Sequence, residues 1–600
     1  MERVVRIGGA SGAWGDSPMA IPQLLREGVD YLIMDYLAEV TMSLLARAKK
    51  KKPEGGYPPD FVAYLAPHLR AIREGNVRVV SNAGGMNPIA CKQSIEALAE
   101  KAGVSLRVAV VEGDDLMPLI PQLRDGICEA VSSAALPDTL LSANAYLGAL
   151  PIAVALERGA DIVITGRCVD SALVLGILMH EFRWQASDYD SLAAGSLAGH
   201  LLECGPQAIG GIFTDWEEVP DWHNIGYPIA ECHADGTFVV TKPKGTGGLV
   251  TPATVAEQVL YEIGDPARYL LPDVTADFSL VRLEPAGADR VMVSGASGQP
   301  PGAQYKVSAT YQDGFRAIAF IVIVGVQAAL KAERTAKALI DRAQMLFKEL
   351  GLPDFSSTHA EALGAEASYG PESKARETRE VVLRLVVDHA DARALDIFAR
   401  QAGAVGISFA QGTAGLIGGR PNTTPLIRLF TFFVDKPALP APEVTVGQDA
   451  PVSVPIPVGG IALATCPTPP VGETEEDEIE EEDLAEVPLL QVAHARSGDK
   501  GNSSNIAIFC RKPEYMPWLR TQLTAERIAA HFAAVAEGPV ERFEAPGLSA
   551  FNFLIQNALG GGGMASARID PQGKAYGQRA LEMMVRVPRR WLRNVSRNAA

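Results

Sequence analysis

The stretch VRVVSNAGGMNP, residues 77–88, joins an apolar β-branched run to a turn of small and polar residues, and a helix-like segment follows it. Runs of the same design occur at residues 2–9, 29–39 and 105–115, and residues 160–172 repeat it. An apolar run without strict alternation is typical of a strand covered on both faces, and alternation of such strands with helices favours a parallel sheet. The sequence therefore predicts an α/β fold with a mostly parallel, layered sheet in its main region.

Ligands of such sheets bind beyond the carboxyl ends of the strands. Glycines at these ends expose backbone N–H groups, and polar side chains stand beside them. The candidate substrate-binding residues at this edge are Gly8, Gly9, Ser11, Asn82, Gly84, Gly85, Arg167 and Asp170.

The chain has 600 residues, too many for one hydrophobic core. We expect a main α/β region over residues 1–465, divisible into lobes 1–237 and 238–465 because the pattern changes to short alternating segments. Residues 472–486 hold ten acids in fifteen positions, so residues 466–486 are expected to form a solvated acidic linker. Residues 487–590 have the β-α-β character of a small α+β domain.

Net charge and composition indicate which classes of partner and which cell compartment suit this protein. The net charge of −17 opposes general attraction to nucleic acids or anionic lipid. The longest apolar stretch, residues 317–330, is shorter than the roughly 20 residues that span a bilayer, and we expect a buried strand there. Seven cysteines without a CxxC pair suit a reducing cytosol. The sequence thus predicts a cytoplasmic protein that binds neither nucleic acid nor membrane.

The loop RIGGASGAWGDSP, residues 6–18, resembles a nucleotide loop only superficially. Its glycines at positions 8, 9, 12 and 15 do not fit G-x-G-x-x-G, and it lacks the lysine of a Walker A loop. Two interpretations stay open, a tight turn at the ligand edge of the sheet or the lining of a site.

The segment TKPKGTGGLVTP, residues 241–252, is the most basic loop of this acidic chain. Two lysines, a glycine-rich turn and a helix start near Thr251 together suit an anion such as the diphosphate of a nucleotide or of coenzyme A. The alternative is a flexible hairpin end with its lysines in water. The candidate residues are Lys242, Lys244, Gly245 and Gly247.

His200, Glu203 and Cys204 stand at i, i+3 and i+4, so a helix would place them on one face. A thiol beside an imidazole can become a thiolate, and a carboxylate can orient that imidazole. The alternative is an inert buried cysteine and an ordinary core histidine. The spacing is not a familiar metal pattern, and we expect no metal.

Asp35 and Glu39 follow the end of a predicted strand, where paired carboxylates suit proton removal from carbon or activation of water. They are equally suited to capping the next helix.

The segment AHARSGDKGNSSN, residues 493–505, is predicted as a polar loop after an apolar strand. It either binds an anion or forms salt bridges to the main region. Its candidate binding residues are Arg496, Ser497, Asp499 and Lys500.

Several long motifs occur in a fixed order along the chain: GGASGAWGDSP (8–18), DYLAEVTM (35–42), SNAGGMNP (81–88), DIVITGRCVDSALVLG (161–176), GHLLECGPQAIGG (199–211), KPKGTGGLVTPATVAEQVLYEIGDPARYLLPDV (242–274), HARSGDKGNSSNIA (494–507) and NFLIQNALGGGG (552–563). On the basis of these ordered motifs, the chain resembles the acyclic terpene utilisation (AtuA-type) family. The resemblance implies a main domain over about residues 1–460 and a ferredoxin-fold-like domain over about 487–590. It also implies a place in the bacterial breakdown of citronellol and geraniol, a route with acyl-CoA intermediates.

The first functional hypothesis is an enzyme of acyl-CoA catabolism, of lyase or hydratase type, acting on branched or isoprenoid acyl-CoA without a cofactor besides the substrate's coenzyme A. Such chemistry needs a base, an oxyanion stabiliser and a phosphate anchor. Asp35 or Glu39 would be the base, the glycine pairs at 8–9 or 84–85 would hold the oxyanion, and Lys242 with Lys244 would anchor phosphate. Cys204 with His200 would be a second acid/base pair or an acyl-accepting nucleophile.

The second hypothesis is a non-catalytic acyl-CoA-binding or scaffold subunit of the same route. A nucleotide-dependent or NAD-dependent enzyme is weakened by the failed fingerprints. An acidic chain with a loop-rich sheet edge also suits a homo-oligomer.

Overall fold

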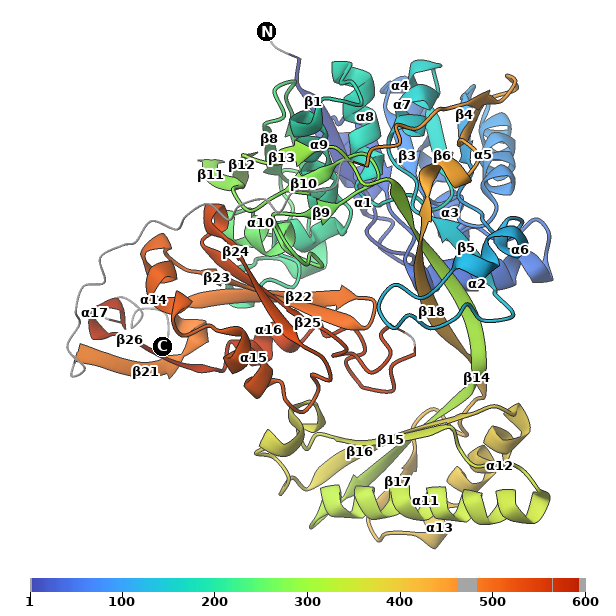
Figure 1. Cartoon of the computed structure of the whole chain (residues 1–600), viewed down its shortest axis with the longest axis vertical. Coiled ribbons are helices and arrows are strands. Elements are labelled where there is room, and N and C mark those ends of the chain that lie inside the picture. The colour runs from blue at the N-terminus through green and yellow to red at the C-terminus, as the bar shows by residue number, and fades with distance from the viewer. Residues whose placement is uncertain (1–2, 461–482, 564, 593–600) are drawn as a thin grey trace.

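The chain folds around one large sheet, with a smaller lobe and a C-terminal domain beside it (Figure 1). The fold is that of a computed structural model, which describes residues 3–460, 483–563 and 565–592, without the side chains of Glu39 and Val40. Along the large sheet the strands are β11 (Arg282–Gly287), β12 (Arg290–Ser294), β8 (Phe238–Thr241), β7 (Ile229–Cys232), β1 (Val5–Gly9), β2 (Tyr31–Met34), β3 (Arg78–Ser81), β6 (Ile162–Thr165), β4 (Val108–Glu112), β19 (Glu443–Val446) and β20 (Val452–Ser453).

The centre of the sheet is parallel. Strands β1, β2, β3, β6 and β4 pair in this order and in one direction, and they are the five strands predicted from the apolar runs. The prediction of a mostly parallel sheet holds only for this centre. Strands on both flanks, β7, β8, β12 and β11 on one side and β19 and β20 on the other, join antiparallel. Short turns connect β7 to β8 and β11 to β12, and short turns make antiparallel pairs.

Helices cover both faces of the parallel centre. Leu32 and Ile164 pack on one face, and their neighbours Ile33 and Val163 pack on the other. Because both faces are apolar, the strands show no alternation of polar and apolar residues. The first face is covered by α1 (Ala20–Glu27), α2 (Glu39–Lys51), α3 (Pro59–Leu65), α4 (Leu69–Glu74) and α5 (Pro88–Ala102), and the second by α7 (Leu150–Glu157), α8 (Ala172–Phe182), α9 (Tyr189–Leu202) and α10 (Pro252–Val259).

A long strand, β14 (Gln304–Val324), leads from the main body into the smaller lobe (Figure 1). Its first half pairs with β18 (Thr424–Asp435) and β5 (Ser142–Ala145), and its second half pairs with the lobe's other strands. The lobe contains β15 (Ser357–Leu363), β16 (Glu380–His389), β17 (Thr413–Leu416), α11 (Ala328–Leu350) and α12 (Ala392–Ala402). The buried strand predicted in residues 317–330 is found up to Val324, and α11 begins four residues later.

Residues 238–294 do not separate from the first part of the chain, because β8, β11 and β12 extend the large sheet. Strands β19 and β20 later return to its opposite edge. In the predicted acidic linker, residues 466–482 lie outside the described part of the chain. Its last residues belong to β21 (Leu484–Pro488), which pairs with β26 (Met584–Pro588).

The C-terminal domain is a four-stranded antiparallel sheet, β22-β23-β25-β24, with short helices. The prediction of a loop over residues 493–505 is wrong, because this segment is mostly strand. Ile506 and Ile508 face the domain's own core, and Ala507 and Phe509 join the core of the main body. With both faces covered, polar side chains on these strands find partners across the interface. The elements are β22 (Ala493–Lys500), β23 (Ser503–Cys510), α14 (Met516–Arg520), α15 (Ala525–His531), β24 (Val540–Ala545), β25 (Ala550–Ile555) and α16 (Tyr576–Ala580).

Candidate functional site

A cavity of about 800 Å³ lies where the main body, β14, β18 and the C-terminal domain meet. Leu37, which follows β2, and Arg167, which follows β6, bring the carboxyl edge of the parallel strands to it. The segment 262–272 forms another wall, and Lys500 extends the β22–β23 hairpin into the lining. The C-terminal domain therefore completes the site.

His200 is the most distinctive side chain of this cavity. It lies in the last turn of α9, is buried, and shares Nδ1 with Oε1 of Glu203 at 2.9 Å. Its Nε2 has no hydrogen-bond partner among the described residues. A carboxylate that holds Nδ1–H leaves the Nε2 lone pair to act as a base. An unpartnered buried nitrogen is costly unless a ligand uses it.

Asp35 lies behind the cavity wall at the end of β2. Its Oδ1 accepts hydrogen bonds from Asn82 Nδ2 at 2.6 Å and from the backbone N–H of Leu37 at 3.1 Å. Burial raises the pKa of Asp35 to about 6, and Glu203 adds to the rise, while the bond from Asn82 and the charge of Arg167 oppose it. Asp35 thus belongs to the electrostatic surroundings of His200 and Glu203 without lining the cavity.

The cavity lining contains both buried and exposed cations. The Arg167 guanidinium lies 4.2 Å from the ring centre of Tyr146, and Nζ of Lys306 lies 4.6 Å from the same ring. Arg167 is buried and also donates to Asp170 at 2.9 Å. Arg268 and Lys500 are exposed at the rim. The same lining also carries carboxylates, so the cations lie among acids and do not form a uniformly positive surface; the acids are Asp170, Glu203, Glu262, Asp265, Asp435 and Asp499.

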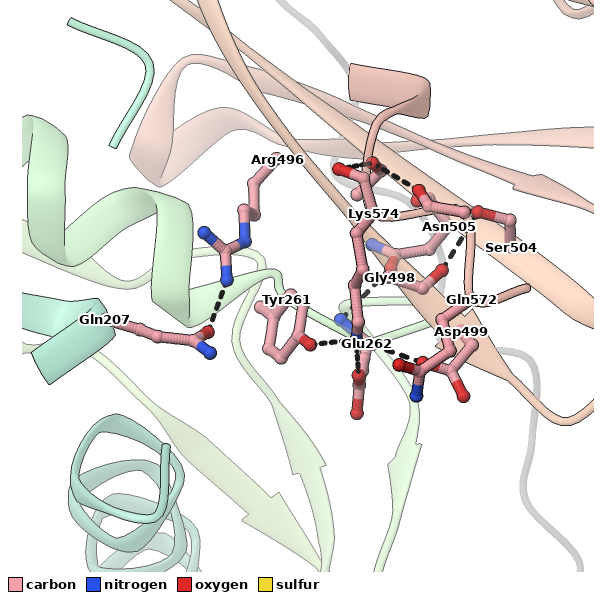
Figure 2. A network of polar contacts seen from close by, with 12 residues as sticks. Gln207, Tyr261, Glu262, Arg496, Gly498, Asp499, Ser504, Asn505, Gln572 and Lys574 are labelled. Carbon is pink, nitrogen blue, oxygen red and sulfur yellow. Dashed lines mark hydrogen bonds and ion pairs between the residues drawn. The ribbon is translucent and has the colours of Figure 1, made fainter. Parts of the chain in front are cut away.

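A cluster of charges fixes the C-terminal domain against the cavity wall (Figure 2). Nζ of Lys574 donates to Glu262 at 2.7 Å, to Asp499 at 3.0 Å and to the hydroxyl of Tyr261. Burial acts to lower the pKa of Lys574, but the contacts with Glu262, Tyr261 and Asp499 together outweigh burial, and the net direction is upward. Gly498 permits this contact, since a Cβ there would lie 2.6 Å from Cγ of Glu262. The hairpin is therefore held closely at the site.

Comparison with known families agrees with this two-part arrangement. Residues 5–444 match the family described as acyclic terpene utilisation family protein AtuA. The chain belongs to the AtuA family. Residues 487–586 match the AtuA ferredoxin-like domain, so the resemblance predicted from the motifs is confirmed for both parts. Comparison with curated proteins and with solved structures finds no match. The family name connects the chain with acyclic terpene utilisation.

Six of the candidate site residues predicted from the sequence line the cavity together. They come from three distant segments, because the ends of β6 and α9 and the β22–β23 hairpin converge only in the folded chain. These residues are Arg167, Asp170, His200, Glu203, Asp499 and Lys500.

The glycine-rich candidates do not line this cavity. In the AtuA-family chain Gly84 allows close packing, since a Cβ there would lie 2.4 Å from the carbonyl oxygen of Thr165. The loop 8–18 closes on itself, with Asp16 accepting from the N–H of Gly12 at 2.9 Å. These contacts are those of tight turns. The candidates outside the cavity lining at the sheet edge are Gly8, Gly9, Ser11, Asn82, Gly84 and Gly85.

The basic loop 241–252 also lies elsewhere, at the end of β8. Nζ of Lys242 donates to the carbonyl of Thr246 at 2.9 Å and lies 3.2 Å from Asp289, so its charge is already engaged. Lys244 and Gly245 are exposed, and Gly247 is buried against the carbonyl of Asp221. None of the four lines the cavity. Thr251 does cap α10, as the predicted helix start requires.

Arg496 and Ser497 do not line the cavity, but their contacts hold the strand β22 beside it. The Arg496 guanidinium lies 4.5 Å from the ring centre of Tyr261 and donates to the carbonyl of Ile212 at 3.1 Å. Ser497 donates to the carbonyl of Gly573 at 2.7 Å, inside the C-terminal domain. Both residues position β22 and the segment that carries Lys574.

Cys204 and Glu39 complete the predicted set. Cys204 follows α9 but does not line the cavity, and burial raises the pKa of its thiol well above its usual value. That direction disfavours a thiolate at this place. Glu39 begins α2, and its side chain lies outside the described residues.

Several lining residues were not predicted from the sequence: Tyr146, Glu262, Arg268, Tyr269, Lys306 and Phe433. Three of them stand in the long AtuA-like motif of residues 242–274, so the motif contained a usable signal. Lys306 and Phe433 lie on β14 and β18, whose meeting at the cavity no local pattern indicates. Among described residues no group of His, Cys, Asp and Glu has the arrangement of a metal site.

Proposed function

We propose that this AtuA-family chain is an enzyme of lyase or hydratase type that moves a proton on a branched or isoprenoid acyl-CoA in acyclic terpene breakdown. The observation that carries the proposal is His200, buried in the cavity wall with Nδ1 against Glu203 and Nε2 unpartnered. Removal of a proton beside a thioester, or from a hydroxyl next to a breaking carbon–carbon bond, needs a base so placed.

The remaining groups of the cavity suit the other needs of this chemistry. Arg167 is buried and lines the same cavity as His200, and its guanidinium suits stabilisation of a developing oxyanion. The exposed cations Arg268 and Lys500 at the rim suit the phosphates of coenzyme A. The apolar side chains Leu270, Leu429 and Phe433 suit a branched hydrocarbon chain. Base, oxyanion partner, anchor and apolar wall are thus available in one place.

The test follows acyl-CoA thioesters with the purified full chain in deuterated water. Short branched and isoprenoid thioesters are incubated, and every species is identified by mass spectrometry. Incorporation of deuterium beside the thioester, together with addition or loss of water or cleavage into two products, is the expected result. Unchanged thioesters that stay bound would favour the non-catalytic binding subunit. Absence of both turnover and binding would overturn the proposal.

A further inference from the structure

A second cavity, of about 440 Å³, lies between the smaller lobe and the C-terminal domain, and it shares no lining residue with the first cavity. Its walls come from α11, β15 and the segment 365–371 on one side, and from residues 534–535 and 568–579 on the other. Many wall residues are alanines, and Val535 and Ile569 add apolar surface.

The interface around this cavity is firmly built. The Arg316 guanidinium pairs with Asp388 and donates to the carbonyls of Ser566 at 2.7 Å and Ala565 at 2.8 Å. Arg384 pairs with Glu361 at 2.6 Å, and Glu361 also accepts from the N–H of Ile569 at 3.0 Å. These contacts fix both walls, so the cavity is a defined space.

One charged side chain in this wall has no polar partner. Arg579, on α16, is only 4% exposed, and among the described residues its guanidinium makes neither an ion pair nor a hydrogen bond. Its Nε and Nη1 are buried. Three aromatic rings surround it, with ring centres 4.9 Å away for Phe532, 5.5 Å for Tyr369 and 5.7 Å for Tyr576. The rings stabilise the cation but accept no conventional hydrogen bond.

Burial of a guanidinium without a hydrogen-bond acceptor costs free energy. A carboxylate or a phosphate matches the parallel N–H groups of the guanidinium and would be the suitable acceptor. The four acids of the same cavity are already engaged: Glu333 with Arg376, Glu361 with Arg384, Glu366 with the N–H of Lys374, and Asp570 with the N–H groups of Lys574 and Ala575. Their negative charges oppose a phosphate dianion. One unpaired cation beside apolar walls instead balances the single charge of a carboxylate that carries an aliphatic group.

We propose that the second cavity is a binding site for a small aliphatic carboxylate, with Arg579 as its anchor. The proposal is independent of the function proposed for the larger cavity. An occupant there contacts both the smaller lobe and the C-terminal domain.

Isothermal titration of the full chain with 4-methylpentanoate tests the site, with 4-methylpentan-1-ol and inorganic phosphate as comparison probes. We expect saturable binding of one carboxylate, at least tenfold weaker binding after Arg579→Met, and unchanged binding after Arg586→Met, a matched substitution at an exposed arginine outside the cavity. Equal binding by wild type and Arg579→Met would overturn the proposal, as would tighter binding of phosphate or equal binding of the alcohol.

A second variant keeps the test decisive if Arg579→Met fails to fold, which circular dichroism and gel filtration report. Ala534 is exposed at the edge of the cavity, and Ala534→Trp fills the space without removing the cation. Loss of carboxylate binding in this folded variant supports the site, and retained binding overturns it. The variant His200→Gln is expected to bind the carboxylate as the wild type does, which separates this site from the larger cavity.

Discussion

The C-terminal domain borders two cavities, and among the described residues a different kind of buried polar group lacks a hydrogen-bond partner in each. In the larger cavity it is a nitrogen of His200, oriented by Glu203, and in the smaller one it is the guanidinium of Arg579. Most charges around them are paired, including Lys574 with Glu262 and Arg316 with Asp388. A neutral base suits proton transfer and a permanent cation suits anion binding. We therefore base the two proposals on buried groups without a partner that also line a cavity, and not on surface charge.

The largest expected effect comes from removing the proposed base. His200→Gln preserves volume but not basicity, and we expect turnover of the active thioester to fall about a hundredfold to ten-thousandfold, the usual contribution of general acid–base catalysis. The measurement is steady-state kinetics by mass spectrometry. The same change at the exposed His223, which does not line the cavity, is the control. Wild-type turnover in His200→Gln would show that His200 is not the base. The larger cavity would then not differ from the smaller one by holding a catalytic base.

The next effect concerns the wall of the smaller cavity. Arg316→Met leaves Asp388 buried without its cation, and loss of one partner of a buried ion pair costs about 3–5 kcal/mol. We expect faster hydrogen–deuterium exchange in residues 565–570, because Arg316 holds the carbonyls of Ala565 and Ser566 at the start of this segment. Arg428→Met removes a more exposed pair with Asp313 and is expected to cost at most about 1 kcal/mol. Equal exchange in both variants would show that the wall does not depend on Arg316.

Asp35 gives a pH-dependent prediction for the larger cavity. Because its folded-state pKa, about 6, exceeds the ordinary value of 3.8, the folded state holds the proton more tightly. Stability contributed by protonated Asp35 is therefore lost as pH rises from about 4 through 6. Asp35→Asn should raise the free energy of unfolding relative to wild type, by a difference that grows over this window toward about 3 kcal/mol, and thermal denaturation at each pH measures it. Asp221→Asn, at an exposed site, should follow the wild-type pH profile.

The smallest effect concerns positioning across the interface. Lys574→Met removes the donor shared by Tyr261, Glu262 and Asp499, so the β22–β23 hairpin loses part of its attachment. We expect KM for the thioester to rise about fivefold to tenfold, near 1 kcal/mol, with kcat little changed. Lys512→Met, in the same domain but at an exposed pair with Glu514, is the control. A fall in kcat with constant KM would assign Lys574 to the chemistry instead.

Local sequence predicted the elements whose signal is local. The five apolar runs became the parallel strands, Thr251 capped α10, and the spacing of His200 and Glu203 produced their contact, since helical geometry brings i and i+3 together. The motifs also led to the correct family and to its two parts. The glycine loops were a less reliable guide, because a close backbone approach to a neighbouring strand requires the same residue as an approach to a ligand.

The sequence by itself thus determined the strands of the sheet centre, the helix that carries His200 and the family of the chain, because periodicity, caps and ordered motifs act over short stretches. Tertiary structure alone decided the antiparallel flanks, the strand character of residues 493–500 and the meeting of Arg167, His200 and Lys500 around one cavity. These three features depend on which surfaces of the chain pack against one another. Burial on both faces explains why a polar segment forms a strand, and burial within the described residues leaves His200 and Arg579 among the cavity-lining side chains without a hydrogen-bond partner.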